Sequence, residues 1–332
     1  MSLDLGYYWQ SISGHLSVMQ QARPITEVLA DPGIDARLRA KLERVQEIRA
    51  FASRELGLPD NGSYTRFADL HRPFVLWNVF ATPELSLKLQ EWCFPVAGCI
   101  SYRGYYAKED ADRYGEQLRG EGLDVYVGGV PAYSTLGWFD DPVLNTFIQY
   151  PDAEVARLLF HELAHQVLYV KGDSAFNESF ATTVEEAGVE RWLAAKNDAA
   201  LEAAYRQFAA RRVQFIALLK KHRTDLEDTF RTAAGDDDKR RGKAAVLAAL
   251  QTDYQALRTS WDGWPGYDRW FAQKITNAHL ASVATYTERV PGFKRLLAEQ
   301  GGDLRRFYDA ARQLADLAKA QRDTRLAVGG SP

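Results

Sequence analysis

The sequence predicts an α+β protein, with a mixed sheet and flanking helices in the N-terminal half and a mostly helical C-terminal half. Two observations support this fold class. β-branched and aromatic runs at residues 75–81, 99–106 and 124–130 predict strands. From residue 151 onward, helical patterns follow one another with only short interruptions.

The strand-containing part covers residues 1–150 and the helical part covers residues 151–327; since no repeat or low-complexity linker separates them, they can also be counted as one domain. With 332 residues, of which 46% are hydrophobic and 26% charged, the chain has the composition of a globular protein. The net charge of −3, with both signs interspersed, gives no support for nucleic-acid binding. No apolar run reaches the roughly 20 residues of a membrane-spanning helix.

The N-terminal part begins with helices. Residues 7–24 mix aromatic and polar side chains, and residues 34–56 carry apolar residues at helical spacing up to a Gly-Leu-Pro stop. An acidic, helix-favouring stretch at residues 108–121 separates the second predicted strand from the third, and a further strand is expected within residues 133–141. The order strand, strand, helix, strand predicts a small mixed sheet rather than a doubly wound one.

Helices account for the remainder of the chain. The first occupies the apolar run 155–170, where Asp152 is placed to cap its start and Gly172 to end it. A second helix runs through Trp192. Later helices are expected at residues 198–234, 243–259, 267–286 and 303–318.

The first of these helices carries the motif His161-Glu162-Leu163-Ala164-His165. Because four residues make about one helical turn, His161 and His165 project from one face and can bind one Zn²⁺ at roughly 2.0–2.1 Å. Glu162 lies about 100° around the helix, where it can accept a proton from an attacking water without binding the metal.

A hydrolytic zinc site needs a third protein ligand and an open position. The second helix follows after a 12-residue interval, Gln166–Asn177, that contains a plausible turn, so the two helices can lie antiparallel. Glu178 is the expected third ligand. Glu185, two turns further on, and Asn177 are expected to support the ligands rather than to bind the metal.

The alternative for the histidine pair is an ordinary amphipathic helix with one buried and one exposed histidine. The chain has six histidines, and two of them flank a glutamate at positions i and i+4 ahead of an Asn-Glu pair. This combination favours the metal site, with one Zn²⁺ per chain.

These residues resemble the gluzincin metallopeptidases, the thermolysin clan. The second helix, Asn177-Glu178-x-Phe180-Ala181-x-x-x-Glu185, is similar to the corresponding segment of the alanyl-aminopeptidase family, although the interval before it is shorter here. Over nearly its whole length, the chain resembles a bacterial family of zinc aminopeptidases. Besides the zinc helix, the stretches that carry this resemblance are Tyr7–Gln10, Trp92–Cys99, Tyr133–Pro142 and Ala284–Tyr286.

The gluzincin resemblance implies that the strand before the zinc helix is a sheet edge that binds extended peptide backbone. Leu136, Gly137 and Trp138 would line this peptide, and Asp140 and Asp141 would be placed to hold the α-ammonium group of a substrate. The alternative is that the Asp-Asp-Pro sequence at residues 140–142 is only a turn. The Gly-x-Met-Glu-Asn motif, which binds the substrate amine in alanyl-aminopeptidases, is absent from the sequence.

The resemblance also implies a hydrogen-bond donor for the reaction's oxyanion in the helical part. Tyr286 is the first choice for this catalytic role and His279 is the second. The alternative for Tyr286 is a packing residue with a bonded hydroxyl.

Cys93 and Cys99 bracket a connection that contains Pro and Gly, and they can close a small disulfide loop in an oxidising compartment. The alternative is two buried free thiols. The resembling family usually carries a lipoprotein leader, which implies a lipid anchor on a removed leader and a location in the bacterial cell envelope or periplasm. Residues 1–4 lack the basic start of a signal peptide, and a native chain that starts at Met1 would be cytoplasmic.

The sequence therefore predicts a zinc-dependent metallopeptidase, an aminopeptidase by resemblance, that acts on peptide or protein substrates. Two alternatives stay open: a zinc-bearing peptide-binding or regulatory module with latent or lost activity, and an endopeptidase of narrow target range.

Overall fold

The computed structural model describes residues 5–94, 98–284 and 289–327. The chain forms two compact units, each assembled from separate stretches of sequence. The first comprises residues 1–77, 129–202 and 286–332, and the second comprises residues 78–128 and 203–285. The boundary expected from sequence between residues 150 and 151 marks a change from strand-containing to helical sequence, and it does not coincide with the borders of these units. A division into two domains at this point stays a prediction.

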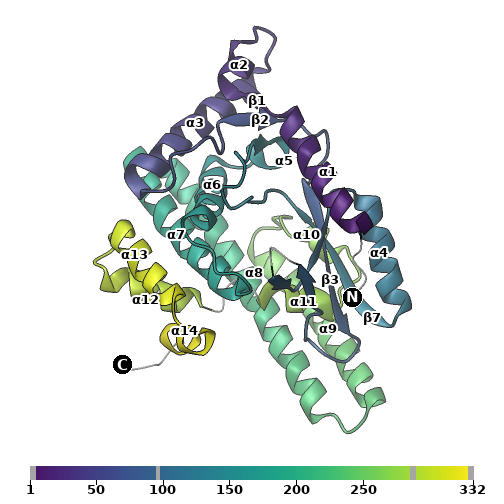
Figure 1. The fold of residues 1–332 in the computed structure, drawn as a ribbon. Helices are drawn as coiled ribbons and strands as arrows, with labels where there is room; N and C mark the ends of the chain where they lie inside the picture. Colours follow the sequence, from purple (N-terminus) through teal and green to yellow (C-terminus); the bar gives the residue numbers. More distant parts are fainter. Residues whose placement is uncertain (1–4, 95–97, 285–288, 328–332) are drawn as a thin grey trace. The chain divides into compact units, whose positions relative to one another are not determined.

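Helices dominate the first unit, and one small sheet joins them (Figure 1). The sheet has the order β1-β2-β8, with β2 (Arg66–Ala68) antiparallel to β1 (Arg23–Pro24) and parallel to β8 (Val143–Leu144). The helices are α1 (Leu5–Gln21), α2 (Ile25–Ala30), α3 (Ala36–Leu56), α5 (Asn145–Ile148), α6 (Asp152–Val167), α7 (Ser174–Lys196), α12 (Val290–Glu299), α13 (Leu304–Ala315) and α14 (Lys319–Leu326).

An aromatic core joins α7 to the C-terminal helices. Phe176 of α7 packs edge-on against Phe293 of α12, and Phe180 of α7 stacks on Phe307 of α13, with ring centroids 4.9 and 5.5 Å apart. All four rings are fully buried, and each contributes about 2–3 kcal/mol through removal of apolar surface from water. The C-terminal helices are therefore part of the support of α7.

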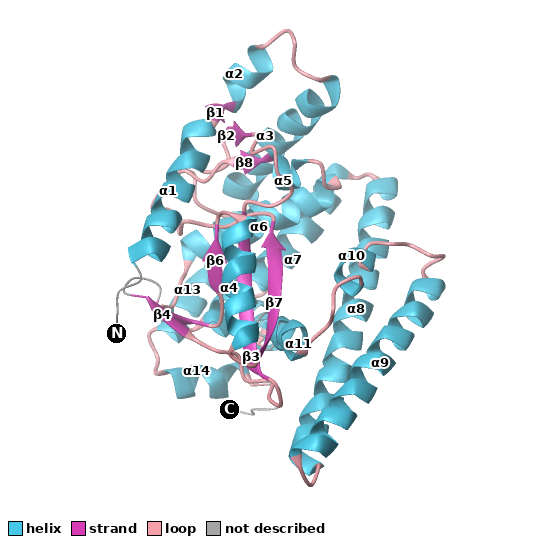
Figure 2. Ribbon diagram, turned by 90° about the vertical axis from the view of Figure 1, so that its right-hand side faces the viewer, coloured by secondary structure: helices cyan, strands magenta, loops and turns pink. Residues whose placement is uncertain are grey.

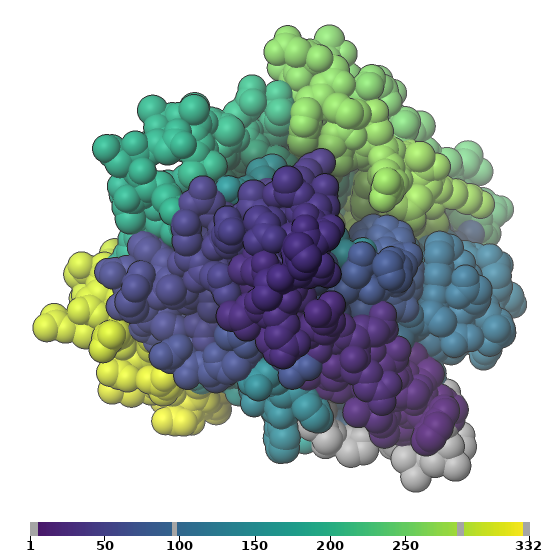
Figure 3. Space-filling model, turned by 90° about the horizontal axis from the view of Figure 1, so that it is seen from above, coloured from purple at the N-terminus to yellow at the C-terminus, as the bar shows by residue number. Residues whose placement is uncertain are grey.

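Helix α1 lies at the molecular surface, coloured purple in Figure 3. Its side chains Trp9, Ile12 and Leu16 are exposed. His15 of the same helix forms a hydrogen bond with the Tyr133 hydroxyl at 2.7 Å. This bond ties α1 to the segment that precedes β8.

A three-stranded sheet forms the centre of the second unit, in the order β6-β3-β7 (Figure 2). Its strands are β3 (Leu76–Pro83), β6 (Arg103–Tyr105) and β7 (Leu123–Val130). Helix α4 (Lys108–Gly120) packs on this sheet so closely that a Cβ at Gly115 would lie 3.2 Å from Val127. A separate hairpin, β4 (Trp92–Phe94) with β5 (Gly98–Ile100), pairs Cys93 with Cys99, and the two form a disulfide.

The rest of the second unit is helical. Helices α8 (Ala199–Thr232) and α9 (Asp236–Ser260) lie side by side (Figure 2), followed by the short α10 (Asp268–Phe271) and α11 (Asn277–Ala284). Leu219 and Leu226 of α8 and Leu250 of α9 belong to one buried core. Within the described residues, no helix is both long and apolar enough to span a bilayer.

The predicted α+β class is confirmed, but the strands divide among three small sheets instead of one. The strand expected at residues 99–106 is two short strands, because the chain bends at Ser101 between β5 and β6. The helix expected at residues 267–286 is broken into α10 and α11 by an irregular stretch within the part that is described. These interruptions depend on packing that a local sequence pattern does not carry.

Candidate metal centre

Helix α6 positions three of the predicted site residues. It begins directly after Pro151, whose carbonyl accepts the first helical hydrogen bonds at 2.8 and 3.0 Å. Leu159 and Leu163 are completely buried and anchor the helix. His161 is partly exposed on this helix, whereas His165, one turn later, is buried.

The start of α6 differs from the expectation in one respect. Asp152 does not cap the helix, because it is the first helical residue instead of the residue before the helix. Its carboxylate binds Lys41 at 2.7 Å and Arg44 at 3.1 Å, both on α3. The helix ends at Val167, and Gly172 adopts a left-handed φ of 76° in the following turn.

Two side chains shape the short connection from α6 to α7. Asp173 caps α7 by accepting a hydrogen bond from the Phe176 N–H at 3.3 Å. The Asn177 amide closes a ring with Val170, accepting from its N–H at 2.7 Å and donating to its carbonyl at 2.8 Å. The two helices pack side by side (Figure 1), and Glu178 thereby faces the histidines of α6.

The three predicted ligands converge. The Nε2 atoms of His161 and His165 are 3.2 Å apart, and the Glu178 carboxylate lies 3.2 Å from His161 Nε2 and 3.8 Å from His165 Nε2. In a tetrahedral site with metal–ligand distances of roughly 2.0–2.1 Å, ligand atoms are about 3.3–3.4 Å apart. Among the described residues, these three form the group suited to hold a metal ion.

Glu185 determines which nitrogen of His161 is available. The His161 Nδ1–H donates to Glu185 at 2.9 Å, which directs Nε2 at the other two expected ligands. Arg157 holds Glu185 through two contacts of 3.0 and 3.1 Å, and Glu154 binds the same guanidinium at 2.8 Å. Glu185 is thus placed behind the site as a support.

The charges of the site favour a cation between the ligands. Burial opposes protonation of His161, but Glu178 and Glu185 outweigh it and hold the pKa of His161 well above its ordinary value. Burial lowers the pKa of His165 to about 4, and its Nδ1 is buried without a partner among the described residues. Two imidazole nitrogens and a carboxylate oxygen are a donor set that suits Zn²⁺, which would replace the proton on His161.

Glu162 has a different environment from Glu178. Burial is the main cause that raises the pKa of Glu162 to about 7, with His161 opposing the effect and Glu178 and Asp141 adding to it. A carboxyl group with a pKa near neutral can both accept and return a proton at physiological pH. Glu162 is therefore suited to act as a general base beside the three ligands.

The predicted substrate strand is wrong. Residues 133–141 contain a turn instead, because Leu136 and Gly137 both have positive φ, 57° and 81°, and the Trp138 N–H donates to the Thr135 carbonyl. Two successive left-handed residues cannot continue a β-strand. Leu136, Gly137 and Trp138 therefore do not form a strand edge, and the strand that precedes α6 is β8. A substrate-binding role for these residues stays a prediction.

The turn still lies next to α6. A Cβ at Gly137 would be 3.7 Å from the Gln166 side chain, and Gln166 directly follows His165. Trp138 is 78% exposed beside it. Asp140 is also exposed and lies against Gly62, at a position where a Cβ on that glycine would clash with its carboxylate.

Two further residues join the site: Asp141, which the sequence offered together with Asp140 as a group for the substrate's α-ammonium, and Tyr64, which sequence reasoning did not single out. Asp141 is buried, accepts from the Thr135 N–H at 2.9 Å, and has its pKa raised by burial to about 6. The negative charge of Asp141 contributes to raising the pKa values of both Glu162 and Tyr64. No sequence motif marks Tyr64, whose role depends on contacts among three separate segments. Tyr286 lies outside the described residues, and His279 belongs to the second unit.

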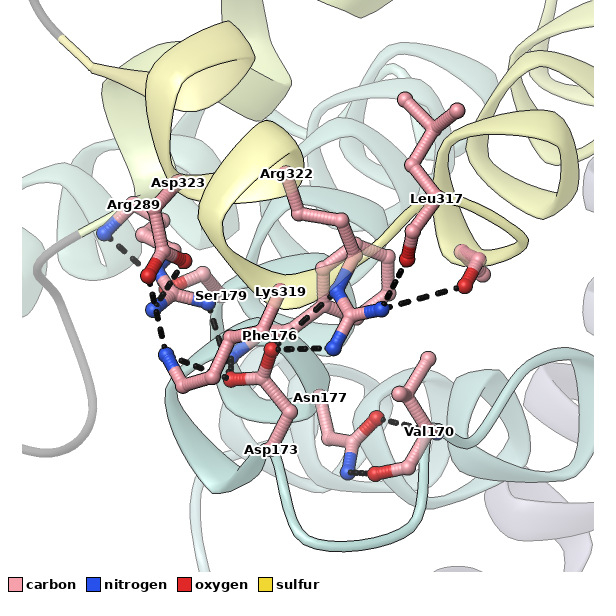
Figure 4. A network of polar contacts seen from close by, with 11 residues as sticks. Val170, Asp173, Phe176, Asn177, Ser179, Arg289, Leu317, Lys319, Arg322 and Asp323 are labelled. Carbon is pink, nitrogen blue, oxygen red and sulfur yellow. Dashed lines mark hydrogen bonds and ion pairs between the residues drawn. The ribbon is translucent and has the colours of Figure 1, made fainter.

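A polar network fastens the C-terminal segment to the start of α7 (Figure 4). The carboxylate of Asp173 is almost completely buried and binds Arg289 at 2.8 Å and Arg322 at 2.9 Å. Arg322 also donates to the Leu317 carbonyl at 2.6 Å. The residue that caps α7 is thus also the residue that holds α14.

The helix pair thus brings two histidines and a glutamate together beside Glu162, and the first three form a donor set that could hold a metal ion. The chain belongs to the family described as "Putative aminopeptidase", whose model matches residues 6–326. Searches of curated proteins and of solved structures gave no match.

Proposed function

We propose that this chain is a zinc-dependent aminopeptidase that hydrolyses peptide bonds with Glu162 as general base. The observation that carries the proposal is the convergence of His161, His165 and Glu178 next to Glu162. Membership of the aminopeptidase family supports a peptide substrate. His161, His165 and Glu178 would hold the metal.

Each residue of the site has a defined task in this reaction. The chemistry supplied by Zn²⁺ when it is bound is polarisation of the scissile carbonyl and a lowered pKa of water. Glu162 accepts a proton from the attacking water and returns it to the leaving amine as the C–N bond breaks. Glu185, fixed by Arg157, keeps the Nδ1 proton of His161 in place and so preserves its Nε2 as a ligand atom.

An aminopeptidase also needs a negative group that holds the substrate's α-ammonium. Asp140 is our candidate, because its carboxylate is exposed on the turn that packs against Gln166, next to His165. An electrostatic contact of this kind selects for a free N-terminus. The proposed contact comes from a turn, since residues 133–141 do not form the expected strand.

We also propose an extracytoplasmic location, in the bacterial cell envelope or periplasm, with a lipid anchor on a removed leader. The Cys93–Cys99 disulfide supports an oxidising compartment. The family resemblance described above supports the leader.

The test combines metal analysis with two substrate panels, on wild type and on Glu162→Gln. One panel consists of amino-acid amides and free peptides, and the other of the same peptides with blocked N-termini. We expect one zinc per chain, cleavage of the free panel by wild type only, and no cleavage of blocked peptides. Cleavage of both panels would instead indicate an endopeptidase, zinc without turnover would indicate a binding module, and a metal-free protein would contradict the zinc proposal.

A further inference from the structure

The segment between α3 and β2, residues 59–65, is held rigidly; we call it the Tyr64 segment. The Arg49 guanidinium, itself buried, donates to the carbonyls of Pro59, Asn61 and Ser63 at 2.7, 3.0 and 2.8 Å. A single cation thus fixes three backbone groups of one short segment. The segment cannot shift without breaking several charge-assisted hydrogen bonds.

The Tyr64 segment is also tied to α6, which carries His161, Glu162 and His165, and to the turn at residues 133–141. Gln166 of α6 accepts from the Asn61 side chain at 2.8 Å and donates to the Ser63 hydroxyl at 3.1 Å. On the other side, the Tyr64 N–H donates to the Asp141 carbonyl at 2.6 Å. Tyr64 is therefore positioned by the residue after His165 and by the turn that precedes β8.

Tyr64 itself has two unfavourable features. Its φ of 65° lies in the left-handed region, which is uncommon for a bulky side chain. Its side chain is 1% exposed, and its hydroxyl has no hydrogen-bond partner among the described residues. Backbone strain of this kind collects at functional sites, and buried hydroxyl groups are nearly always bonded.

The surroundings keep the Tyr64 hydroxyl protonated. Burial raises the pKa of Tyr64 well above 10, the carboxyl groups of Glu162 and Asp141 and the Tyr133 phenol raise it further, and Arg49 opposes them only partly. The hydroxyl is thus a hydrogen-bond donor at every working pH. The charges of Glu162 and Asp141 act on the hydroxyl, yet it donates a hydrogen bond to neither carboxylate.

Tyr308 shows what a buried tyrosine of this unit does when its role is structural. Its side chain is 3% exposed, and its hydroxyl donates to the Leu56 carbonyl at 2.9 Å. Tyr308 thus satisfies a backbone group, whereas the Tyr64 hydroxyl of the same unit has no hydrogen-bond partner in the part of the chain that the structure describes. The difference between these two tyrosines is what requires an explanation.

We propose that Tyr64 is a catalytic residue, whose hydroxyl donates a hydrogen bond to the oxygen of the scissile carbonyl as negative charge develops there. A donor held without a partner in the resting protein gains its partner only when the reaction creates one, which is how preorganised oxyanion donors work. The inference rests on the proposed peptidase function. It assigns to Tyr64 the role that the family resemblance assigned to Tyr286.

The experiment compares Tyr64→Phe with Tyr308→Phe. Removing the free hydroxyl of Tyr64 should lower kcat on amino-acid amides by about 10²–10³-fold, with KM and zinc content unchanged and Tm unchanged or slightly higher. Removing the bonded hydroxyl of Tyr308 should have the opposite effect, because the buried Leu56 carbonyl loses its hydrogen-bond donor. Tm should fall, and kcat should stay at the wild-type value.

Several results would overturn the proposal. A kcat of Tyr64→Phe within about threefold of wild type would show that the hydroxyl does not contact the transition state. A loss of zinc or of Tm in proportion to the loss of activity would show a structural role. A shift of the acid limb of the pH–rate profile would show that Tyr64 acts through Glu162. An inactive wild type would overturn the peptidase proposal and this inference together. Equal activity of wild type and Tyr64→Phe would overturn this inference alone.

Discussion

Two glutamates flank the same pair of histidines, and their surroundings give them opposite protonation behaviour. Burial acts against the charged form of Glu178, but His161 and His165 outweigh it and lower its pKa. Burial prevails at Glu162 and raises its pKa to about 7. Glu178 is therefore suited to remain an anionic ligand, and Glu162 is suited to exchange a proton.

The substitution Glu162→Gln tests proton transfer separately from metal binding. The amide cannot accept a proton, so we expect kcat to fall by about 10²–10⁴-fold or more while zinc stays bound, because Glu162 is not a ligand. Metal analysis and amide hydrolysis on the same preparation measure both quantities. Substantial residual cleavage would remove Glu162 from the role of general base.

Glu178→Ala should remove a ligand. Zinc affinity, measured by competition with a chromophoric chelator, should fall by more than the 10–100-fold that is typical for loss of a supporting residue. The remaining histidine pair leaves the metal with only two protein ligands. An unchanged zinc affinity would show that Glu178 is not the third ligand, and Glu185 would then be the first alternative.

Glu185→Ala tests the support behind His161. Loss of the Nδ1 partner frees the imidazole to rotate and leaves Arg157 with one carboxylate fewer, so zinc affinity should fall by about 10–100-fold. The neighbouring Glu186, which binds Lys294 at 2.5 Å, provides a matched control. Glu186→Ala should bind zinc as wild type does, and equal effects of the two variants would contradict the proposed support.

At the scale of elements, one buried carboxylate joins the start of α7 to the C-terminal helices. Asp173 accepts from the backbone of α7 and from Arg289 and Arg322 at once. Burial acts against its ionisation, but Arg322 and the other cations outweigh it, so the pKa of Asp173 is lowered. The anchoring of α14 and the capping of α7 therefore depend on the same charge.

Asp173→Asn should lower the free energy of unfolding by about 3 kcal/mol at pH 7, because it leaves two arginines without their carboxylate. Since the folded pKa is below the ordinary value, the stabilisation is present above about pH 4 and is lost as pH falls through the folded pKa. Denaturant unfolding at several pH values should thus show wild type and variant converging in acid.

A control for this prediction is Asp323→Asn. Asp323 binds Arg289 at 2.6 Å, but its side chain is 42% exposed, so the change should cost less than about 1 kcal/mol. Equal losses from Asp173→Asn and Asp323→Asn would show that burial of Asp173 carries no special weight.

The helix pair was predictable from sequence because its determinants are local. The spacing of His161 and His165 and the nearby Asn177-Glu178 pair place all three ligands on adjacent helical faces. The turn at Leu136 and Gly137 was not predictable, since apolar and aromatic residues there favour a strand, whereas both residues adopt a positive φ in a turn where the Thr135 N–H donates to the Asp141 carboxylate. Tyr64 was hidden for a similar reason: its position depends on Arg49, Gln166 and Asp141, which are remote in sequence.

For the whole molecule, the Cys93–Cys99 bridge bears on the compartment in which the protein works. We expect thiol titration of the denatured protein to detect no free cysteine until a reductant is added. Replacing both cysteines by serine should destabilise the second unit by about 2 kcal/mol, as expected for a loop this short. Free thiols in protein isolated from its native source would contradict the extracytoplasmic proposal.

All three expected ligands lie within one 18-residue segment, His161–Glu178, whose connection is closed by the Asn177 side chain. Contacts between residues so near in sequence cost little loop-closure entropy and form early in folding. The segment can therefore pair before Asp173 meets Arg289 and Arg322. On the proposal that it holds zinc, metal uptake can precede completion of the fold, and the helical hairpin would act as a chelating peptide around which the remaining chain assembles.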